Sequence, residues 1–545
     1  MSLGSLYLLS LASLSWSLVP SAGILPTQTI FILLVFYAFF RYCLPKLPEE
    51  FFSKLFLTLS IIILTIGYYQ LLQLGLTEGL GGKAIYKVSG LSAHKNILAS
   101  YTVLLFGLNL WYLPVQKGRW VYLLLALQVL LILILRARTS MIALMILIIL
   151  FFFENRKKWA FHWKPVIISL SIFAAAITIS FYLLVNKLGG TGVDISRLNP
   201  MNFKKDLSFI ERLVIWYKTS FLIKEHWIGG IGAGNWKIFF PSQSYSGIYI
   251  LQSRDIMYTR VHNDFIEILA ELGIAGILIF LAIFIIPLIA LIHPRFRPSD
   301  KPFPWLPIGM IFCFGLFSMI EFPKERQELM VLWAFILALI VFQRAKFFSA
   351  KNFSWCISKR KVKWGIFIAS ILCSLNIFIG IIMARGEFHT LKMLQAQKNG
   401  QWPIVEYESQ KAYSAFYQIT PIAIAVKWYE GLAAYHEGNF EKAKVLFQLA
   451  MKHTPYFLRL LNDYASCLVQ TGDLEGAVDL YLQVMDINPK FEDGMFNLSY
   501  VYAQLGRFDK ALEWVEMTKN DEQKKNEFIQ QIHSLMQKDS ILPSN

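Results

Sequence analysis

The segment that decides the fold carries three motifs: ERLVIWYKTSFLIKEHW at residues 211–227, GGIGAGNW at 229–236 and TRVHNDFIEILAELGIAGILIF at 259–280. Basic, polar and glycine residues gather here between two long hydrophobic blocks. A membrane protein keeps such polarity together where it meets water or a substrate. We therefore take this segment as the functional centre, preceded by a membrane scaffold and followed by a separate C-terminal module.

The composition is that of a polytopic membrane protein. Of 545 residues, 56% are hydrophobic and only 16% are charged, and the mean hydropathy is +0.48, which excludes an ordinary soluble protein. The charge balance changes near Arg385: residues 1–384 hold 36 basic and 16 acidic side chains, and residues 385–545 hold 16 and 20. The basic half fits an anionic membrane surface or substrate better than nucleic acid, because it contains no soluble basic domain.

Hydrophobic segments of about 20 residues, the length of a bilayer crossing, predict an all-α transmembrane bundle over residues 1–384. We expect about eleven spans, near residues 4–20, 25–42, 52–73, 97–114, 120–135, 139–153, 165–186, 265–292, 304–321, 328–343 and 364–384.

The loops between these spans predict the orientation. Alternate loops hold 18 basic residues on one side, and the short loops of the other side hold seven. The positive-inside rule assigns the first set to the cytoplasm. The N-terminus is then inside, and the long loop of about 187–262 and the C-terminal domain at 385–545 are outside.

Two arginines, Arg136 and Arg138, interrupt the run LLLILILRARTSMIALMIL with no acidic neighbour. On this topology they lie at the outer face, together with a loop of 10 basic and 5 acidic residues. Interfacial snorkelling is the structural alternative. We favour binding of a fixed anion, because the pair opposes the topological charge bias.

The C-terminal domain contains a repeat of 34 residues. Three sets of residues share this period: Gly438, Gly472 and Gly506; Ala443, Ala477 and Ala511; Pro455 and Pro489. The unit has the order helix, glycine turn, helix, proline. It resembles the tetratricopeptide repeat, which stacks into an α-solenoid with a concave binding face.

His262 is the candidate general base, because an imidazole titrates near neutral pH and a neighbouring carboxylate can orient it. It lies where the outer loop meets a membrane helix, and Asn263, Asp264 and Glu267 follow it. The structural alternative is a helix N-terminus capped by Asn263 or Asp264. The two interpretations are compatible.

Arg212 begins an amphipathic helix whose Leu213, Trp216 and Tyr217 are expected at the membrane surface. A guanidinium binds phosphate through two parallel hydrogen bonds, so Arg136, Arg138 and Arg212 are candidates for a pyrophosphate clamp. An ion pair between Arg212 and Glu211 is the alternative.

Two common kinds of site have no signature. The glycines at 229–234 follow no strand and precede no P-loop lysine, so they predict a tight turn and not a nucleotide site. Histidines and carboxylates show no metal-binding spacing, and the five cysteines form no CxxC pair. We expect neither a metal nor a cofactor.

The order of these motifs resembles the O-antigen ligase superfamily, which includes O-antigen polymerases and bacterial protein O-oligosaccharyltransferases. The resemblance lies in Arg-x-x-x-Trp at Arg212, the glycine-rich stretch, His-Asn at His262 and Glu-Leu-Gly-x-x-Gly at Glu271. AHKNILASY, with Asn96, resembles the asparagine-containing segment of this superfamily. RARTS, with Arg138, resembles its arginine-containing segment. The match covers about residues 25–345, with Ala-Arg-Thr where the superfamily has Ser-Arg-Gly.

The resemblance implies a GT-C-like glycosyltransferase that moves a glycan from undecaprenyl pyrophosphate to an acceptor hydroxyl, without metal and with inversion. His262, Arg212 and Arg138 would be catalytic. The substrate-binding residues would be Arg136, Asn96, Lys218, Asn263 and Glu267.

The resemblance also implies a place and partners. The enzyme would lie in the bacterial inner membrane with a periplasmic C-terminal domain, and its acceptor would be lipid A core, a growing polymer or a protein. The repeats favour a protein partner. A lipid or glycan transporter is the non-enzyme alternative, but the inverted repeats and mid-membrane charges typical of transporters are missing from the sequence. A membrane-anchored repeat scaffold would need one span.

Overall fold

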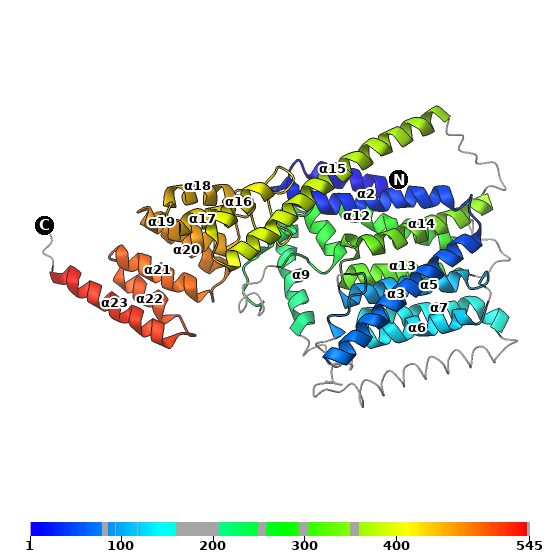
Figure 1. Cartoon of the computed structure of the whole chain (residues 1–545), viewed down its shortest axis with the longest axis horizontal. Helices are drawn as coiled ribbons and strands as arrows, with labels where there is room; N and C mark the ends of the chain where they lie inside the picture. Colours follow the sequence, from blue (N-terminus) through cyan, green and yellow to red (C-terminus); the bar gives the residue numbers. More distant parts are fainter. Residues whose placement is uncertain are drawn as a thin grey trace.

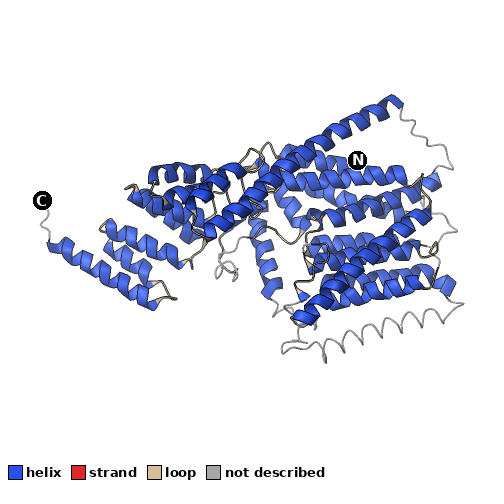
Figure 2. Ribbon diagram, viewed as in Figure 1, coloured by secondary structure: helices blue, strands red, loops and turns tan. Residues whose placement is uncertain are grey.

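The computed structural model describes residues 2–78, 85–92, 94–116, 118–159, 207–248, 258–293, 303–348 and 359–541. Within these ranges all regular elements are helices, apart from two isolated β-bridges at Ser414–Tyr417 and Ile419–Ala425 (Figure 2). The predicted all-α class is confirmed. Figure 1 shows a membrane bundle at one end of the molecule and a helical solenoid at the other.

The bundle is built from the first helices of the chain and from those that follow the outer loop. These elements are α1 (Ser2–Ser13), η1 (Pro20–Gly23), α2 (Ile24–Cys43), α3 (Glu49–Thr77), α5 (Lys95–Tyr112), α6 (Trp120–Leu135), α7 (Arg138–Trp159), α12 (Asp264–Ile292), α13 (Trp305–Ile320), α14 (Gln327–Phe348) and α15 (Lys359–Lys398).

Six of the described helices are long and apolar enough to cross a membrane: those at Pro20–Cys43, Glu49–Thr77, Arg138–Arg156, Asp264–Ile292, Gln327–Arg344 and Lys363–Lys398. Three apolar helices, α1, α6 and α13, are shorter. A helix of 12 residues such as α1 extends about 18 Å, against a hydrocarbon core of about 30 Å. The predicted count of eleven is therefore not confirmed, and the expected span at 165–186 lies outside the described residues.

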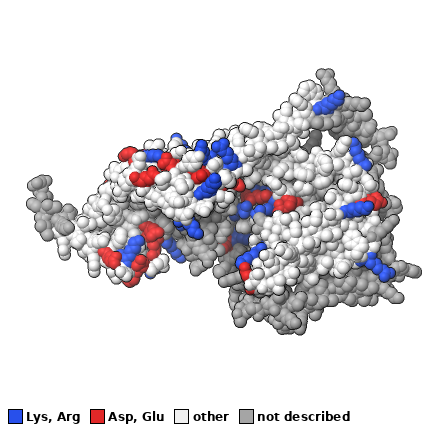
Figure 3. Space-filling view, viewed as in Figure 1, with Lys and Arg blue, Asp and Glu red and all other residues white. Residues whose placement is uncertain are grey.

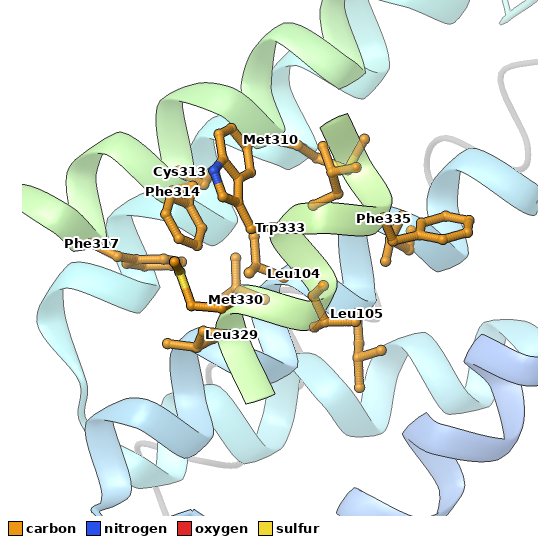
Figure 4. Packing of buried hydrophobic residues seen from close by; sticks show 14 of the residues in the cluster. Leu104, Leu105, Met310, Cys313, Phe314, Phe317, Leu329, Met330, Trp333 and Phe335 are labelled. Carbon is orange, nitrogen blue, oxygen red and sulfur yellow. The ribbon is translucent and has the colours of Figure 1, made fainter. Parts of the chain in front are cut away.

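The centre of the bundle is an aromatic and aliphatic core contributed by α2, α3, α5, α13 and α14 (Figure 4). The rings of Phe314 and Trp333 stack with centroids 4.4 Å apart and planes 7° apart. Phe335 contacts the rings of Phe40 and Phe56 edge-on. In a bilayer such packing holds helices together by van der Waals contact, because lipid tails are as apolar as the side chains.

The helix α9 (Leu207–His226) and three short elements lie at the end of the bundle that faces the solenoid: α10 (Trp236–Phe239), η5 (Phe240–Gln243) and η7 (Pro323–Glu325). Helix α9 runs across the direction of the bundle helices (Figure 1). Its Leu213 and Tyr217 are 45% and 65% exposed, as expected for a helix on a membrane surface.

The solenoid confirms the predicted repeat. It consists of α16 (Trp402–Ala412), α17 (Val426–His436), α18 (Phe440–Met451), α19 (Leu458–Gln470), α20 (Leu474–Ile487), α21 (Glu492–Gln504), α22 (Phe508–Glu516) and α23 (Glu522–Ile541). The periodic glycines have φ of 79°, 84° and 71°, the left-handed conformation that ends a helix. The periodic alanines are fully buried between the paired helices.

The expected boundary at residues 384 and 385 falls inside α15, which continues without a break from its membrane part into the solenoid. The solenoid also touches the outer loop. The backbone nitrogen of Tyr245 donates to the carbonyl oxygen of Ile487 over 2.6 Å, and Ser244 Oγ donates to the same oxygen over 3.1 Å. Trp236, Phe240 and Tyr245 share one apolar cluster with the helices of the repeats.

Candidate active site

One of the predicted arginines lies at the break between α6 and α7. Arg136 caps α6 with φ 53° and ψ 35°, a left-handed conformation. Its Nε and Nη2 atoms are buried without a hydrogen-bond partner in the described part of the chain. Arg138 is exposed at the first position of α7. Lys95, at the start of α5, lies close enough to feel both charges, and its ammonium donates to the carbonyl oxygen of Leu135 over 3.1 Å.

Helix α9 supplies the third predicted arginine. Arg212 Nη1 donates to the carbonyl oxygen of Ile320, the last residue of α13, over 2.9 Å. Trp216, expected at the membrane surface, instead turns inward, and its indole nitrogen donates to the carbonyl oxygen of Val261 over 3.0 Å. Lys218 donates to the carbonyl oxygen of Gln243 over 2.9 Å, so its ammonium holds the outer loop in this structure.

His262 is held from both sides in a left-handed conformation, with φ 58°. The preceding residue, Val261, is fixed by Trp216 on one side, and its backbone nitrogen donates to Glu267 Oε2 over 3.1 Å on the other. Asn263 Oδ1 accepts the backbone N–H groups of Phe265 and Ile266 over 3.0 and 3.1 Å. Asn263 is therefore the N-cap of α12, and Glu267 fixes the backbone beside the imidazole.

The His262 imidazole lies edge-on to the ring of Phe322, with ring centroids 5.4 Å apart, and its Nδ1 atom is buried without a partner in the described part. Burial and the charges of Arg212 and Arg260 lower the pKa of His262 to about 4, against the opposing influence of Glu325. The imidazole is therefore neutral at physiological pH, which a general base requires.

The loop at residues 321–326, between α13 and α14, adds residues that the sequence analysis did not select. The guanidinium groups of Arg260 and Arg326 lie 4.4 and 4.8 Å from the ring centroid of Phe322, within range of a cation–π interaction. Arg260 forms a salt bridge with Glu325. Arg326 Nε is buried without a hydrogen-bond partner in the described chain.

Lys324 anchors this loop to α12. Its ammonium lies 2.6 Å from Glu267 Oε1 and 4.0 Å from Glu271 Oε2, and its side chain is only 8% exposed. Its backbone nitrogen donates to Asp264 Oδ2 over 3.1 Å. The surrounding carboxylates raise the pKa of Lys324, so the ammonium stays charged and binds the loop to the first two turns of the helix.

The glycine-rich stretch forms the tight turn predicted from the sequence and inserts into a break in α12. Gly273 leaves the helical conformation, with φ 64° and ψ −163°. The freed backbone groups pair with the turn: Ile274 N donates to the carbonyl oxygen of Trp227 over 2.9 Å, and Gly232 N donates to that of Glu271 over 2.9 Å. A Cβ atom on Gly230 would lie 2.3 Å from the Glu271 backbone, which explains the requirement for glycine here.

These elements bring His262, Arg212, Arg260 and Arg326 into one electrostatic neighbourhood, which also includes His94 at the start of α5. Arg136 and Arg138 act electrostatically on Lys95, which follows His94 in the chain. On the face drawn in Figure 3, charged side chains appear in the recess between bundle and solenoid and at the opposite end of the bundle, and the bundle surface between them is almost free of charge.

Glu321, next to this group, accepts a hydrogen bond from Ser100 Oγ over 3.2 Å, and burial raises its pKa to about 7. Asn96 is the half-buried second residue of α5, and its backbone nitrogen donates to Nδ1 of His94. Among the described residues, no group of three or more His, Cys, Asp or Glu side chains is placed to hold a metal ion. A metal-independent reaction remains a prediction.

Two family models match segments of the chain. Residues 100–281 match the family model "O-Antigen ligase", and residues 458–491 and 493–516 match the tetratricopeptide repeat. The "Protein CTR9 homolog" of Arabidopsis thaliana is 29% identical over 132 residues, which cover 21% of this chain and 12% of that protein. The chain thus spans about an eighth of the length of this curated relative.

A solved structure named "MamA MSR-1 C2" is 19% identical, with a TM-score of 0.25, and the match covers 29% of this chain and 91% of that one. The two family matches confirm the resemblance stated from the sequence. The chain is a multi-pass membrane protein with a segment that matches the O-antigen ligase model and includes Arg136, Arg138, Arg212 and His262, followed by a segment that matches tetratricopeptide repeats.

Proposed function

We propose that this protein transfers a glycan from undecaprenyl pyrophosphate to an acceptor hydroxyl at the outer face of the bacterial inner membrane. The observation that supports this best is a neutral imidazole, His262, surrounded by arginines from separate segments of the chain. Neutral imidazole is suited to take a proton. Arginines suit a phosphate-bearing leaving group. A lipid pyrophosphate supplies the activated bond, so the reaction needs no nucleotide.

The reaction is an in-line displacement at the anomeric carbon. The acceptor oxygen attacks this carbon as its proton passes to His262. The bond between the carbon and the pyrophosphate oxygen breaks, and its electron pair leaves with undecaprenyl pyrophosphate. Arg212 and Arg138, with Arg136 beside them, stabilise the charge on the leaving group. Attack opposite to the leaving group inverts the anomeric configuration.

Donor binding also changes the pKa of the base, His262. In the structure, the charges of Arg212 and Arg260 lower the pKa of His262. A bound pyrophosphate carries negative charge and offsets these cations, so it raises the pKa of His262 towards its ordinary value. A base with a higher pKa takes the acceptor proton more readily. The imidazole becomes an effective base when the donor is in place.

Other residues hold this arrangement. Asn263 caps the helix that follows His262, Glu267 fixes Val261, and Lys324 fixes the loop that carries Phe322 and Arg326. These contacts support a positioning role for Asn263 and Glu267 in place of the direct substrate contact expected from the sequence. Lys218 has a structural contact with Gln243, and binding of the donor by Lys218 and Asn96 remains a prediction.

Ligation to lipid A core, polymerisation of O-antigen and transfer to a protein would use the same chemistry with different acceptors. The solenoid beside the outer loop favours a partner or acceptor that contains polypeptide, because stacked repeats bind peptides on their concave face. We place this solenoid in the periplasm. A transporter would bind the same donor but leave its glycosidic bond intact.

The test uses the full-length protein in lipid nanodiscs with undecaprenyl-pyrophosphate-linked glycan. Lipid A core, a glycan acceptor and a serine-containing protein are offered in turn. We expect one of these acceptors to gain the glycan by mass spectrometry, with release of undecaprenyl pyrophosphate. Donor that binds but stays intact with every acceptor would support transport and overturn the enzymatic proposal.

A further inference from the structure

A second imidazole lies in the same neighbourhood and has no role in the mechanism above. His94 is the N-cap of α5 in an extended conformation, with φ −157° and ψ 149°. Its Nδ1 atom accepts the backbone N–H of Asn96 over 3.2 Å. The cap hydrogen bond thus occupies one of the two ring nitrogens.

This hydrogen bond determines where the remaining proton lies. A neutral imidazole has one acceptor nitrogen and one N–H donor. Because Nδ1 is the acceptor, the proton is on Nε2. Burial and the charges of Lys95, Arg326 and Arg212 lower the pKa of His94, so the ring keeps this neutral form at physiological pH. The N-terminal end of the helix dipole favours the neutral form as well.

The surroundings of the ring are those of the proposed donor site. Arg212 comes from α9, Arg326 from the loop at 321–326, and His262 from the outer loop, and each lies within electrostatic range of His94. The remaining close ring is that of Tyr86, with centroids 6.2 Å apart. In the described part of the chain, Nε2 has no hydrogen-bond acceptor of its own.

We propose that His94 is a substrate-binding residue whose Nε2–H donates a hydrogen bond to a phosphate oxygen of the lipid-linked pyrophosphate. This inference rests on the proposed function. A neutral donor contributes a directional hydrogen bond without adding another cation to a site that must later release an anion. His94 and His262 thus have opposite tasks: His94 gives a hydrogen bond to the leaving group, and His262 takes a proton from the acceptor.

Three substitutions separate this role from that of a cap. His94→Asn keeps an oxygen near the position of Nδ1 and is a favoured N-cap, but its amide does not reach the position of Nε2. His94→Gln brings an N–H donor to the position of Nε2 and is a poor cap. His94→Ala has neither group.

The experiment measures donor affinity and melting temperature for the full-length wild type and the three variants. We expect His94→Asn to melt like the wild type but bind the undecaprenyl-pyrophosphate glycan about 10- to 100-fold more weakly, the range for a hydrogen bond to a charged group. We expect His94→Gln to retain more affinity than His94→Asn despite a lower melting temperature. Inorganic pyrophosphate is the competitor, and it should show the same ranking if the contact is to phosphate.

If His94→Asn binds the donor as tightly as the wild type, His94 is a helix cap only and the inference is wrong. If pyrophosphate binding is unchanged but lipid-linked donor binding falls, the contact is to the glycan or the lipid, which also overturns it. A failure of the proposed function is recognised separately in the wild type, which then either binds neither probe or binds the donor without transferring its glycan to any acceptor.

Discussion

At the scale of single residues, strain and unpaired polar atoms coincide with the candidate chemistry. Four described residues other than glycine have a left-handed backbone, and two of them are Arg136 and His262. Both also have buried side-chain nitrogens without partners in the described chain. Strained backbone persists where surrounding contacts fix it, and it is concentrated at functional sites. At His262 the fixing contacts come from Trp216 and Glu267, which hold the neighbouring Val261.

Substitutions of His262 and of Arg212 should have different effects on turnover and on donor affinity. His262→Ala removes the base, so we expect turnover to fall by about 10²- to 10⁴-fold with donor affinity nearly unchanged. Arg212→Ala removes a contact to a group that is charged before and during the reaction, so donor affinity should fall as well as rate. Arg212→Lys should recover only part of the donor affinity and rate, because an ammonium lacks the bidentate geometry of a guanidinium.

Lys224→Ala is the matched control for this comparison, because Lys224 is exposed on the same helix as Arg212. Donor binding and single-turnover transfer are measured for each purified variant. Full transfer activity in His262→Ala would remove His262 from the mechanism and leave it as a residue at a helix end.

The pH dependence should report the charges around His262. In the free enzyme, kcat/KM should fall as the pH drops through about 4, the lowered pKa of the base. In the donor complex the pKa of His262 is higher, so kcat should begin to fall at a higher pH than kcat/KM. Arg260→Gln removes a cation and frees Glu325, and both effects raise the pKa of His262. The acidic limb of the kcat/KM profile should therefore move to higher pH in this variant. An acidic limb that stays at the same pH in Arg260→Gln would contradict the assignment of His262 as the base.

The sequence pointed to Arg136 because it interrupts an apolar run, and to His262 and Arg212 because each lies at the start of an expected helix in or beside the long loop. It did not identify Arg260 and Arg326 as site residues. Their importance depends on contact with Phe322, a residue distant from Arg260 in the chain, and no local pattern encodes that contact. The one available signal was that EFPKER places charged residues in a short outer loop. Likewise, the bond of Lys218 to the carbonyl oxygen of Gln243 depends on the fold of the loop.

At the scale of elements, the glycine-rich turn and the broken helix α12 form a single interlocked unit. The break at Gly273 frees backbone groups, and the turn at 227–232 pairs with them. The two motifs are about 40 residues apart in the sequence, and neither shows the pairing alone. The sequence supported the turn and the helix, but it gave no sign that the helix is interrupted where the turn enters.

This interlock predicts a specific sensitivity. In Gly273→Ala, the new Cβ would lie 2.1 Å from the carbonyl oxygen of Ile228, and the left-handed backbone alone costs about 1–3 kcal/mol. We expect a clear fall in melting temperature and loss of transfer, because α12 carries the cap of the His262 loop. The control is Gly380→Ala, where a Cβ meets nothing within 4 Å. Equal melting temperatures for the two variants would argue against the interlock.

At the scale of the whole molecule, we expect the long loop and the solenoid to lie on the same, outer side of the membrane. Basic residues are frequent before the last span, and only Arg385 stands just after it, so the positive-inside rule predicts that the solenoid is outside. Alkaline phosphatase fused after residue 400 should be active, and green fluorescent protein fused there should be dark. The reverse pattern would separate the solenoid from the donor side and overturn the proposed arrangement.

The sequence predicted the two-part architecture well, because hydropathy and a 34-residue period are strong local signals. The expected count of about eleven spans is not confirmed. The first expected span runs to residue 20, whereas α1 ends at Ser13. There the chain turns back through a 3-10 helix, and Asn235 Oδ1 accepts the backbone N–H of Val19 over 2.9 Å. That turn depends on a tertiary contact, which composition does not reveal.

Because α15 is one continuous helix of 40 residues, the angle of the solenoid is set by helical pitch. One residue inserted just before Arg385 would rotate the solenoid by about 100° about the helix axis and turn Ile487 away from Tyr245. Seven inserted residues, about two turns, would restore the angle but raise the solenoid by about 10 Å. The helix therefore fixes both the angle of the solenoid and its distance from the bundle. In the proposed reaction, this distance limits the size of an acceptor that can pass between the repeats and the bundle to reach His262.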